Sequence, residues 1–124
     1  MTRGARDHCK DLGATNSTGH KGSDGNFVDA RVNRYGEWAK AIGENIAYGE
    51  ENARDVVLGM IIDDGNPKRG HRENIFNANY GFAGVSLTGH STQGALCVIN
   101  FAGAFTEKTI SDDSTSTKPV AKKF

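Results

Sequence analysis

Two histidines and three carboxylates of this sequence stand where side chains can do chemistry. His20 and His71 each lie in a glycine-flanked loop segment, where side chains are presented rather than packed. Glu44 lies on an otherwise apolar extended segment, and Asp63 and Asp64 end a helical pattern just before the His71 loop. If these segments converge, two imidazoles and two carboxylates share a pocket. Such a set suits zinc with an open position for water, and it suits acid/base work, because a buried carboxylate beside a histidine shifts both pKa values.

Spacing alone leaves the nature of this site open. The sequence contains no His-Glu-x-x-His, Cys-x-x-Cys, P-loop or Gly-x-Ser-x-Gly pattern. Each acid also has a purely structural interpretation. Glu44 can be a strand-end carboxylate that accepts backbone hydrogen bonds. Asp63 and Asp64 can form a solvated helix end, although negative charge at a helix C-terminus opposes the helix dipole.

The acids before the second histidine loop depend on a helix that the sequence predicts over residues 52–64. On a helical wheel of roughly 100° per residue, Asp64 lies near the middle of the apolar stripe and Asp63 lies on its edge. Gly65 and Pro67 end the pattern. The stripe is made by Ala53, Val56, Val57, Met60 and Ile61.

The remaining segments predict a layered fold. The expected elements are helices over residues 2–12 and 27–35, an extended segment over 42–49, a polar loop over 66–80, and strands over 82–88 and 95–102. Gly13 is the expected C-cap of the first helix, and residues 89–94 join the two strands as a hairpin loop. The second strand is almost entirely apolar, which indicates cover on both of its faces. We therefore expect a helix layer, a sheet and a second helix layer.

Composition excludes several classes of partner. The 124 residues contain 15 basic and 15 acidic side chains, so the chain has no long-range attraction to nucleic acid or to an anionic membrane. No apolar run is long enough to span a bilayer, and residues 1–7 lack the apolar core of a signal peptide. The length fits one domain, and the polar residues from 106 to 124 predict a disordered tail.

Four motifs occur in an order that is specific to one family. They are GHKGSDG at 19–25, IGENIAYG at 42–49, VV at 56–57 leading to IIDDG at 61–65, and RGHRENIF at 69–76; GV at 84–85 and CVINFA at 97–102 follow as closing strands. Together they resemble the SCP-like domain of the CAP superfamily (cysteine-rich secretory proteins, venom antigens and pathogenesis-related proteins), especially its bacterial and protist members. The resemblance covers residues 5–105.

This resemblance implies an α/β fold, a three-layer α-β-α sandwich around a mainly antiparallel sheet. It implies an SCP-like domain over residues 1–105 whose first helix is shortened at its N-terminus. It also implies a cavity lined by His20, Glu44, His71 and a second acid, which is usually a glutamate and here falls on Asp63. Asp63 is one methylene shorter than that glutamate, and the wheel favours Asp64 for burial, so both are retained. In this family the two histidines can bind zinc or another divalent cation, and the resemblance places them here at His20 and His71.

The function that the resemblance implies is binding rather than catalysis, and no catalytic residue is assigned. We expect a secreted, extracellular domain with a lipid or sterol ligand or a cell-surface protein partner. Two alternatives stay open: a zinc-dependent hydrolase with Glu44 as general base, and a structural module of the cell surface. Cys9 and Cys97 allow either one disulfide or two free thiols, and a bridge between the first helix and the last strand is a hypothesis.

Overall fold

Among the residues that the structure describes, the sheet at the centre of the molecule has four strands in the order β1-β3-β2-β4, and every neighbouring pair is antiparallel. The computed structural model describes residues 1–90, 92–108 and 122–123. The strands are β1 (Gly36–Tyr48), β2 (Phe82–His90), β3 (Gly94–Glu107) and β4 (Lys122–Lys123). Strand β3 lies between β1 and β2 and carries the almost entirely apolar run that the sequence predicts for a strand covered on both faces.

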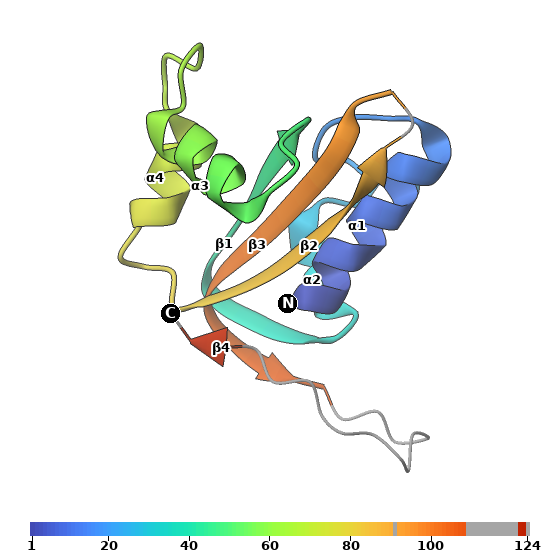
Figure 1. Cartoon of the computed structure of the whole chain (residues 1–124). Helices are drawn as coiled ribbons and strands as arrows, with labels where there is room; N and C mark the ends of the chain where they lie inside the picture. The colour runs from blue at the N-terminus through green and yellow to red at the C-terminus, as the bar shows by residue number, and fades with distance from the viewer. Residues whose placement is uncertain (91, 109–121, 124) are drawn as a thin grey trace.

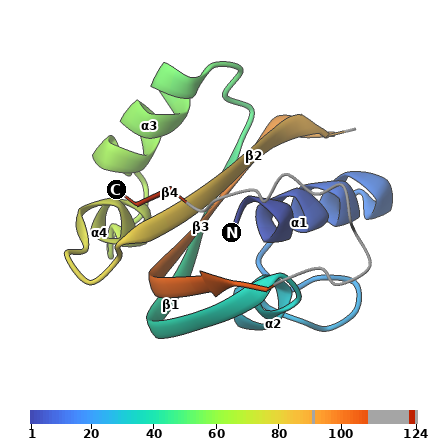
Figure 2. The same cartoon turned by 90° about the horizontal axis from the view of Figure 1, so that it is seen from below.

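Helices cover both faces of this sheet, as Figures 1 and 2 show. Helices α1 (Thr2–Thr15) and α2 (Val28–Asn33) lie on one face, and α3 (Ala53–Ile62) and α4 (Gly70–Phe76) lie on the other. The alternation of β3 explains this arrangement, because successive side chains of a strand point to opposite faces. The predicted three-layer α-β-α sandwich is confirmed.

Within the described part of the chain, three small apolar clusters hold the layers together. The first joins α1 to the sheet, the second joins α2 to the ends of β1 and β3, and the third lies under α3. Each fully buried aliphatic side chain in them contributes about 1.5–3 kcal/mol. Their buried members are Ala5, Cys9, Leu12, Ile46, Leu96 and Val98; Met1, Val32 and Ala102; and Val56, Met60 and Cys97.

Two helix ends differ from the sequence prediction. Helix α1 runs through Gly13 to Thr15 and is capped by Asn16, which has a left-handed backbone (φ 54°) and donates its N–H to the Leu12 carbonyl oxygen. Gly13 faces β2 from within the helix, where a Cβ would make an ordinary van der Waals contact, 3.5 Å from the Gly89 carbonyl oxygen, so it does not end the helix. Helix α3 stops at Ile62, two residues earlier than expected.

Helix α4 was not predicted, because its residues fall within the segment 66–80 that the sequence analysis assigned to a polar loop. Seven residues with no buried side chain give too short an apolar pattern to indicate a helix. Its first turn is stabilised by the carboxylate of Asp63, the residue that follows α3.

The strand β3 continues two residues beyond the predicted domain boundary at 105. Thr106 and Glu107 pair with Glu37 and Gly36 of β1, and Lys122–Lys123 pair with the start of β2. The rest of the expected disordered tail, residues 109–121 and 124, lies outside the described residues. Within the part of the chain that the structure describes, no helix has both the length and the apolar character needed to cross a bilayer.

The hypothesis of a Cys9–Cys97 disulfide is wrong in this structure, where both cysteines are buried free thiols. Cys9 lies on the α1 face, and its thiol donates to the Ser86 carbonyl oxygen at 3.5 Å. Cys97 packs against Val56 and Met60 of α3 on the opposite face. The first helix and the last strand are neighbours, as expected, but the alternation of β3 turns Cys97 away from Cys9.

We therefore expect the native protein to resist thiol modification. Burial raises the pKa of Cys97 to about 11, so almost none of it is thiolate at pH 8. A colorimetric thiol assay should give two equivalents in denaturant and slow, incomplete reaction without it. Electrophoretic mobility after oxidation should be unchanged by reductant. Loss of both thiols after oxidation of the folded protein would contradict the arrangement.

Candidate functional site

The first histidine–acid pair lies on the α1–α2 face of the sheet. The Nδ1 atom of His20 lies 2.8 Å from Oε1 of Glu44. The Glu44 side chain is only 1% exposed, whereas that of His20 is 51% exposed. Because an ionised carboxylate only accepts hydrogen bonds, Nδ1 of His20 is the donor, and in the neutral ring the lone pair is therefore on Nε2. The pair thus fixes the tautomer of a half-exposed imidazole.

The charge of Glu44 is balanced by a residue that sequence reasoning missed. Arg31 of α2 donates from Nη2 to Oε2 of Glu44 at 2.7 Å and is itself 2% exposed. The amide orientation of Asn100 that pairs both of its polar atoms also lets it donate to Oε2 at 2.9 Å. Glu44 therefore accepts from side chains, not from the backbone as its structural interpretation proposed.

A signal for Arg31 was present in the sequence. Val28, Arg31, Val32 and Tyr35 follow the i, i+3, i+4, i+7 spacing of one helix face. An arginine on an apolar helix face and a glutamate on an apolar strand face each require a partner for burial. Each residue is therefore the partner that the other requires.

The second pair lies on the α3–α4 face. Nδ1 of His71 lies 2.9 Å from Oδ1 of Asp63, and the other carboxylate oxygen accepts from the backbone N–H groups of His71 (2.9 Å) and Arg72 (3.3 Å). Burial by itself would raise the pKa of Asp63, but the hydrogen bonds from His71 and Arg72 outweigh it and hold the pKa below its usual value. Asp63 thus satisfies N–H groups in the first turn of α4, which a helix cannot satisfy internally.

Two arginines at the start of α4 make reciprocal contacts with the end of α3. Arg72 donates to the carbonyl oxygens of Ile61 (2.5 Å) and Ile62 (2.8 Å), and Arg69 donates to those of Ile62 and Asp63. Cations at the C-terminal carbonyls of a helix also complement its dipole. The end of α3 and the start of α4 therefore satisfy each other, and this fixes the backbone from which His71 projects.

Asp64 does not belong to either pair, since it is exposed while Asp63 is only 5% exposed. The helical wheel gave the opposite order because it extended the helix through both residues. Helix α3 ends at Ile62, and Asp63 adopts the left-handed conformation (φ 49°). Beyond that residue the angular spacing of a helix no longer applies.

The two pairs are connected through Glu44 and Asn45, successive residues of β1, which lies at one edge of the sheet. Asn45, next to Glu44, points to the opposite face, where its Nδ2 donates to the His71 carbonyl oxygen at 3.0 Å. Its Oδ1 accepts from Asn74 at 2.8 Å. Within residues 1–90, 92–108 and 122–123, no three His, Cys, Asp or Glu side chains group closely enough to hold a metal ion. The structure brings each histidine to one carboxylate and does not gather all four into one such group.

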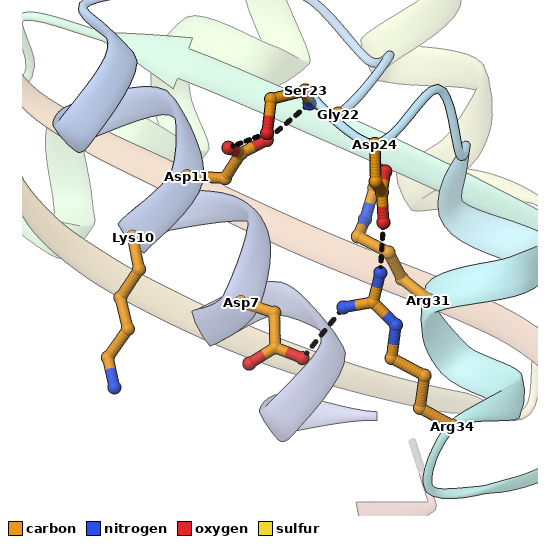
Figure 3. Close-up of a pocket in the computed structure, with 8 residues that line it drawn as sticks. All are labelled: Asp7, Lys10, Asp11, Gly22, Ser23, Asp24, Arg31 and Arg34. Carbon is orange, nitrogen blue, oxygen red and sulfur yellow. Dashed lines mark hydrogen bonds and ion pairs between the residues drawn. The ribbon is translucent and has the colours of Figure 1, made fainter.

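A separate polar cavity of about 320 Å³ lies behind the loop that carries His20 (Figure 3). Arg34 bridges Asp7 (3.1 Å) and Asp24 (2.5 Å), and Asp11 accepts from the Ser23 backbone N–H and hydroxyl. These contacts connect residues 23–24 of the loop to α1 and to Arg34, which follows α2. The lining residues are Asp7, Lys10, Asp11, Gly22, Ser23, Asp24, Arg31 and Arg34, none of which is a predicted cavity residue.

Comparison with known proteins agrees with this architecture. The model of the cysteine-rich secretory protein family (CAP) matches residues 1–101. Among solved structures, an outer surface protein from Borrelia burgdorferi superposes with a TM-score of 0.65 at 20% sequence identity, over 85% of this chain and 71% of that one. A search of curated proteins gives no match. Because the family match spans most of the sequence and the fold is shared, the chain belongs to the CAP family of cysteine-rich secretory proteins.

Proposed function

We propose that this CAP domain is an extracellular binding module that recognises its ligand through the exposed imidazoles of His20 and His71, with a divalent cation such as zinc held by their Nε2 atoms. The observation that carries the proposal is shared by both pairs. Each histidine has Nδ1 on a buried carboxylate, at 2.8 Å for His20 and 2.9 Å for His71.

This arrangement is typical of histidines that bind metal. A carboxylate behind Nδ1 fixes the tautomer and the ring orientation and makes Nε2 a better ligand. In this view Glu44 and Asp63 orient the histidines and are not themselves ligands. The rings are 51% and 35% exposed, so a ligand can reach them without unfolding the loops.

Two histidines supply only part of the tetrahedral shell that zinc takes in proteins. The remaining positions would be filled by water or by groups of a bound partner, and an open shell of this kind suits recognition. Family membership and the outer surface neighbour support a place outside the cell and a cell-surface partner. A lipid or sterol ligand belongs to the proposal through the family alone.

The zinc-dependent hydrolase is the weaker alternative on this geometry. A general base must reach a water or a substrate proton. Both oxygens of Glu44 are already engaged, Oε1 by His20 and Oε2 by Arg31, and the side chain is almost fully buried. Binding therefore needs no rearrangement of Glu44, whereas hydrolysis would need one of its oxygens to leave its partner.

The test is a calorimetric titration of zinc into metal-free protein. We expect saturable one-to-one binding that falls at least about tenfold, or 1.4 kcal/mol, in His20→Ala and in His71→Ala and disappears in the double variant. His90→Gln is the control, because His90 lies in neither pair and its ring contacts the Ser17 carbonyl oxygen. Circular dichroism establishes that each variant is folded. Binding that persists in the double variant, or no heat from the folded wild type, would refute the cation site.

A further inference from the structure

We infer that Arg31 is a positioning residue for His20, one that fixes both its main chain and its imidazole ring. The inference rests on the proposed function only in giving His20 a binding role, since the contacts themselves are independent of any metal.

Arg31 holds the His20 loop at both of its ends. Its Nη1 donates to the carbonyl oxygen of His20 (3.1 Å) and to that of Asn26 (3.0 Å). Its Nη2 donates to Glu44 Oε2 (2.7 Å), and Glu44 Oε1 binds the His20 ring. The contacts form a closed circuit from Arg31 through Glu44 and the His20 ring to the His20 backbone and back.

Only an arginine has the donors for this circuit. The planar guanidinium presents several N–H groups in a fixed fork, whereas a lysine ammonium is a compact point charge on a flexible stem. A lysine at position 31 can balance the charge of Glu44, but it cannot present two separated nitrogens to a carboxylate and two carbonyl oxygens in one geometry. The charge and the loop contacts of Arg31 can therefore be separated by experiment.

The residue before His20 is held in the same way from two other elements. The backbone N–H of Gly19 donates to the Tyr48 hydroxyl (2.8 Å), and its carbonyl oxygen lies 2.7 Å from Nε2 of His8. His8 is completely buried, and desolvation lowers its pKa, so it stays neutral and donates from Nε2. Gly19 has φ +98°, a backbone conformation that residues with a side chain rarely adopt. This position therefore requires a glycine.

Stability alone does not account for a buried arginine at this place. Replacing a buried ion pair by apolar residues is often neutral or stabilising. What apolar side chains cannot supply is the hydrogen-bonded orientation of His20 and of residues 20–26. This difference separates a positioning role from a merely structural one.

The experiment reads the imidazole tautomers of metal-free protein by nitrogen–proton NMR at pH 8, together with amide exchange over residues 20–26. In the wild type we expect both His20 and His71 as the Nδ1–H tautomer. The first variant is Arg31→Lys, which keeps the positive charge. The second is Arg31→Met combined with Glu44→Gln, which removes both charges while the amide oxygen at position 44 still accepts from the His20 ring. Arg34→Met is the matched control, because Arg34 fastens the same loop through exposed ion pairs.

We expect both Arg31 variants to raise amide exchange in residues 20–26 on the order of tenfold and to mix the tautomers of His20, while His71 stays unchanged on its own carboxylate. Arg34→Met should leave the His20 tautomer as it is. A folded Arg31→Met/Glu44→Gln variant that keeps both the Nδ1–H form and the loop protection overturns the inference. Since no metal is present, tautomer loss in these variants beside a wild type that fails to bind zinc would support the inference and refute the proposed function.

Discussion

Replacing Glu44 by leucine is expected to lower the free energy of unfolding by about 3–5 kcal/mol, the range for breaking a buried ion pair from one side. The variant leaves the Arg31 guanidinium, 2% exposed, without the carboxylate that lies 2.7 Å away. It also removes the acceptor for the His20 ring. Urea unfolding followed by circular dichroism measures the loss.

Two further variants show whether charge is the cause. Combining Glu44→Leu with Arg31→Met removes both charges and should recover most of the lost stability, so that the double variant costs far less than the sum of the two single ones. Asp24→Asn weakens the exposed pair with Arg34 at 2.5 Å and should cost far less than Glu44→Leu, because solvent screens an exposed ion pair. A Glu44→Leu loss no larger than that of Asp24→Asn would mean that Glu44 does not compensate the buried arginine.

The layers of this fold could be predicted because they follow from local patterns. The apolar run of β3 indicated two covered faces, and the apolar stripe predicted over residues 52–64 indicated which helix would supply one cover. Of that stripe Val56 and Met60 are buried, whereas Val57 is 43% exposed. Motif order placed His20, Glu44, Asp63 and His71 as candidates, and the structure places one histidine on each of two acids.

What could not be predicted depends on where helices end and on which face a side chain takes. Helix α4 has no apolar stripe and owes its start to Asp63, a contact across eight residues that a window of periodicity does not detect. The wheel misplaced Asp64 because the left-handed turn at Asp63 lies beyond the helix. The disulfide hypothesis compared elements and omitted the strand alternation that turns Cys97 away from Cys9.

Asp63→Ala is expected to lower the free energy of unfolding by about 2–4 kcal/mol, because it removes three contributions at once. Alanine in the left-handed conformation costs about 1–2 kcal/mol. The first turn of α4 loses an acceptor that is worth about 1 kcal/mol when supplied by a cap. The His71 ring loses its charged partner, a bond worth about 1.5–3 kcal/mol. These contributions overlap, so their sum is an upper bound.

Asp63→Asn separates the charge from the backbone, since asparagine tolerates the left-handed conformation and keeps one acceptor oxygen. We expect it to lose about half as much stability as Asp63→Ala. Asp64→Ala, at an exposed position, should stay within about 0.5 kcal/mol of wild type.

The pH dependence of stability gives a second test. The folded-state pKa of Asp63 is lowered, so its contribution to stability is fully present above the unfolded value of about 3.9 and is lost as the pH falls through the folded value. The stability difference between wild type and Asp63→Asn should therefore persist at pH 6 to 8 and should shrink below about pH 3.9. A difference that instead disappears between pH 6 and 8 would show that a group other than the Asp63 carboxylate controls the junction of α3 and α4.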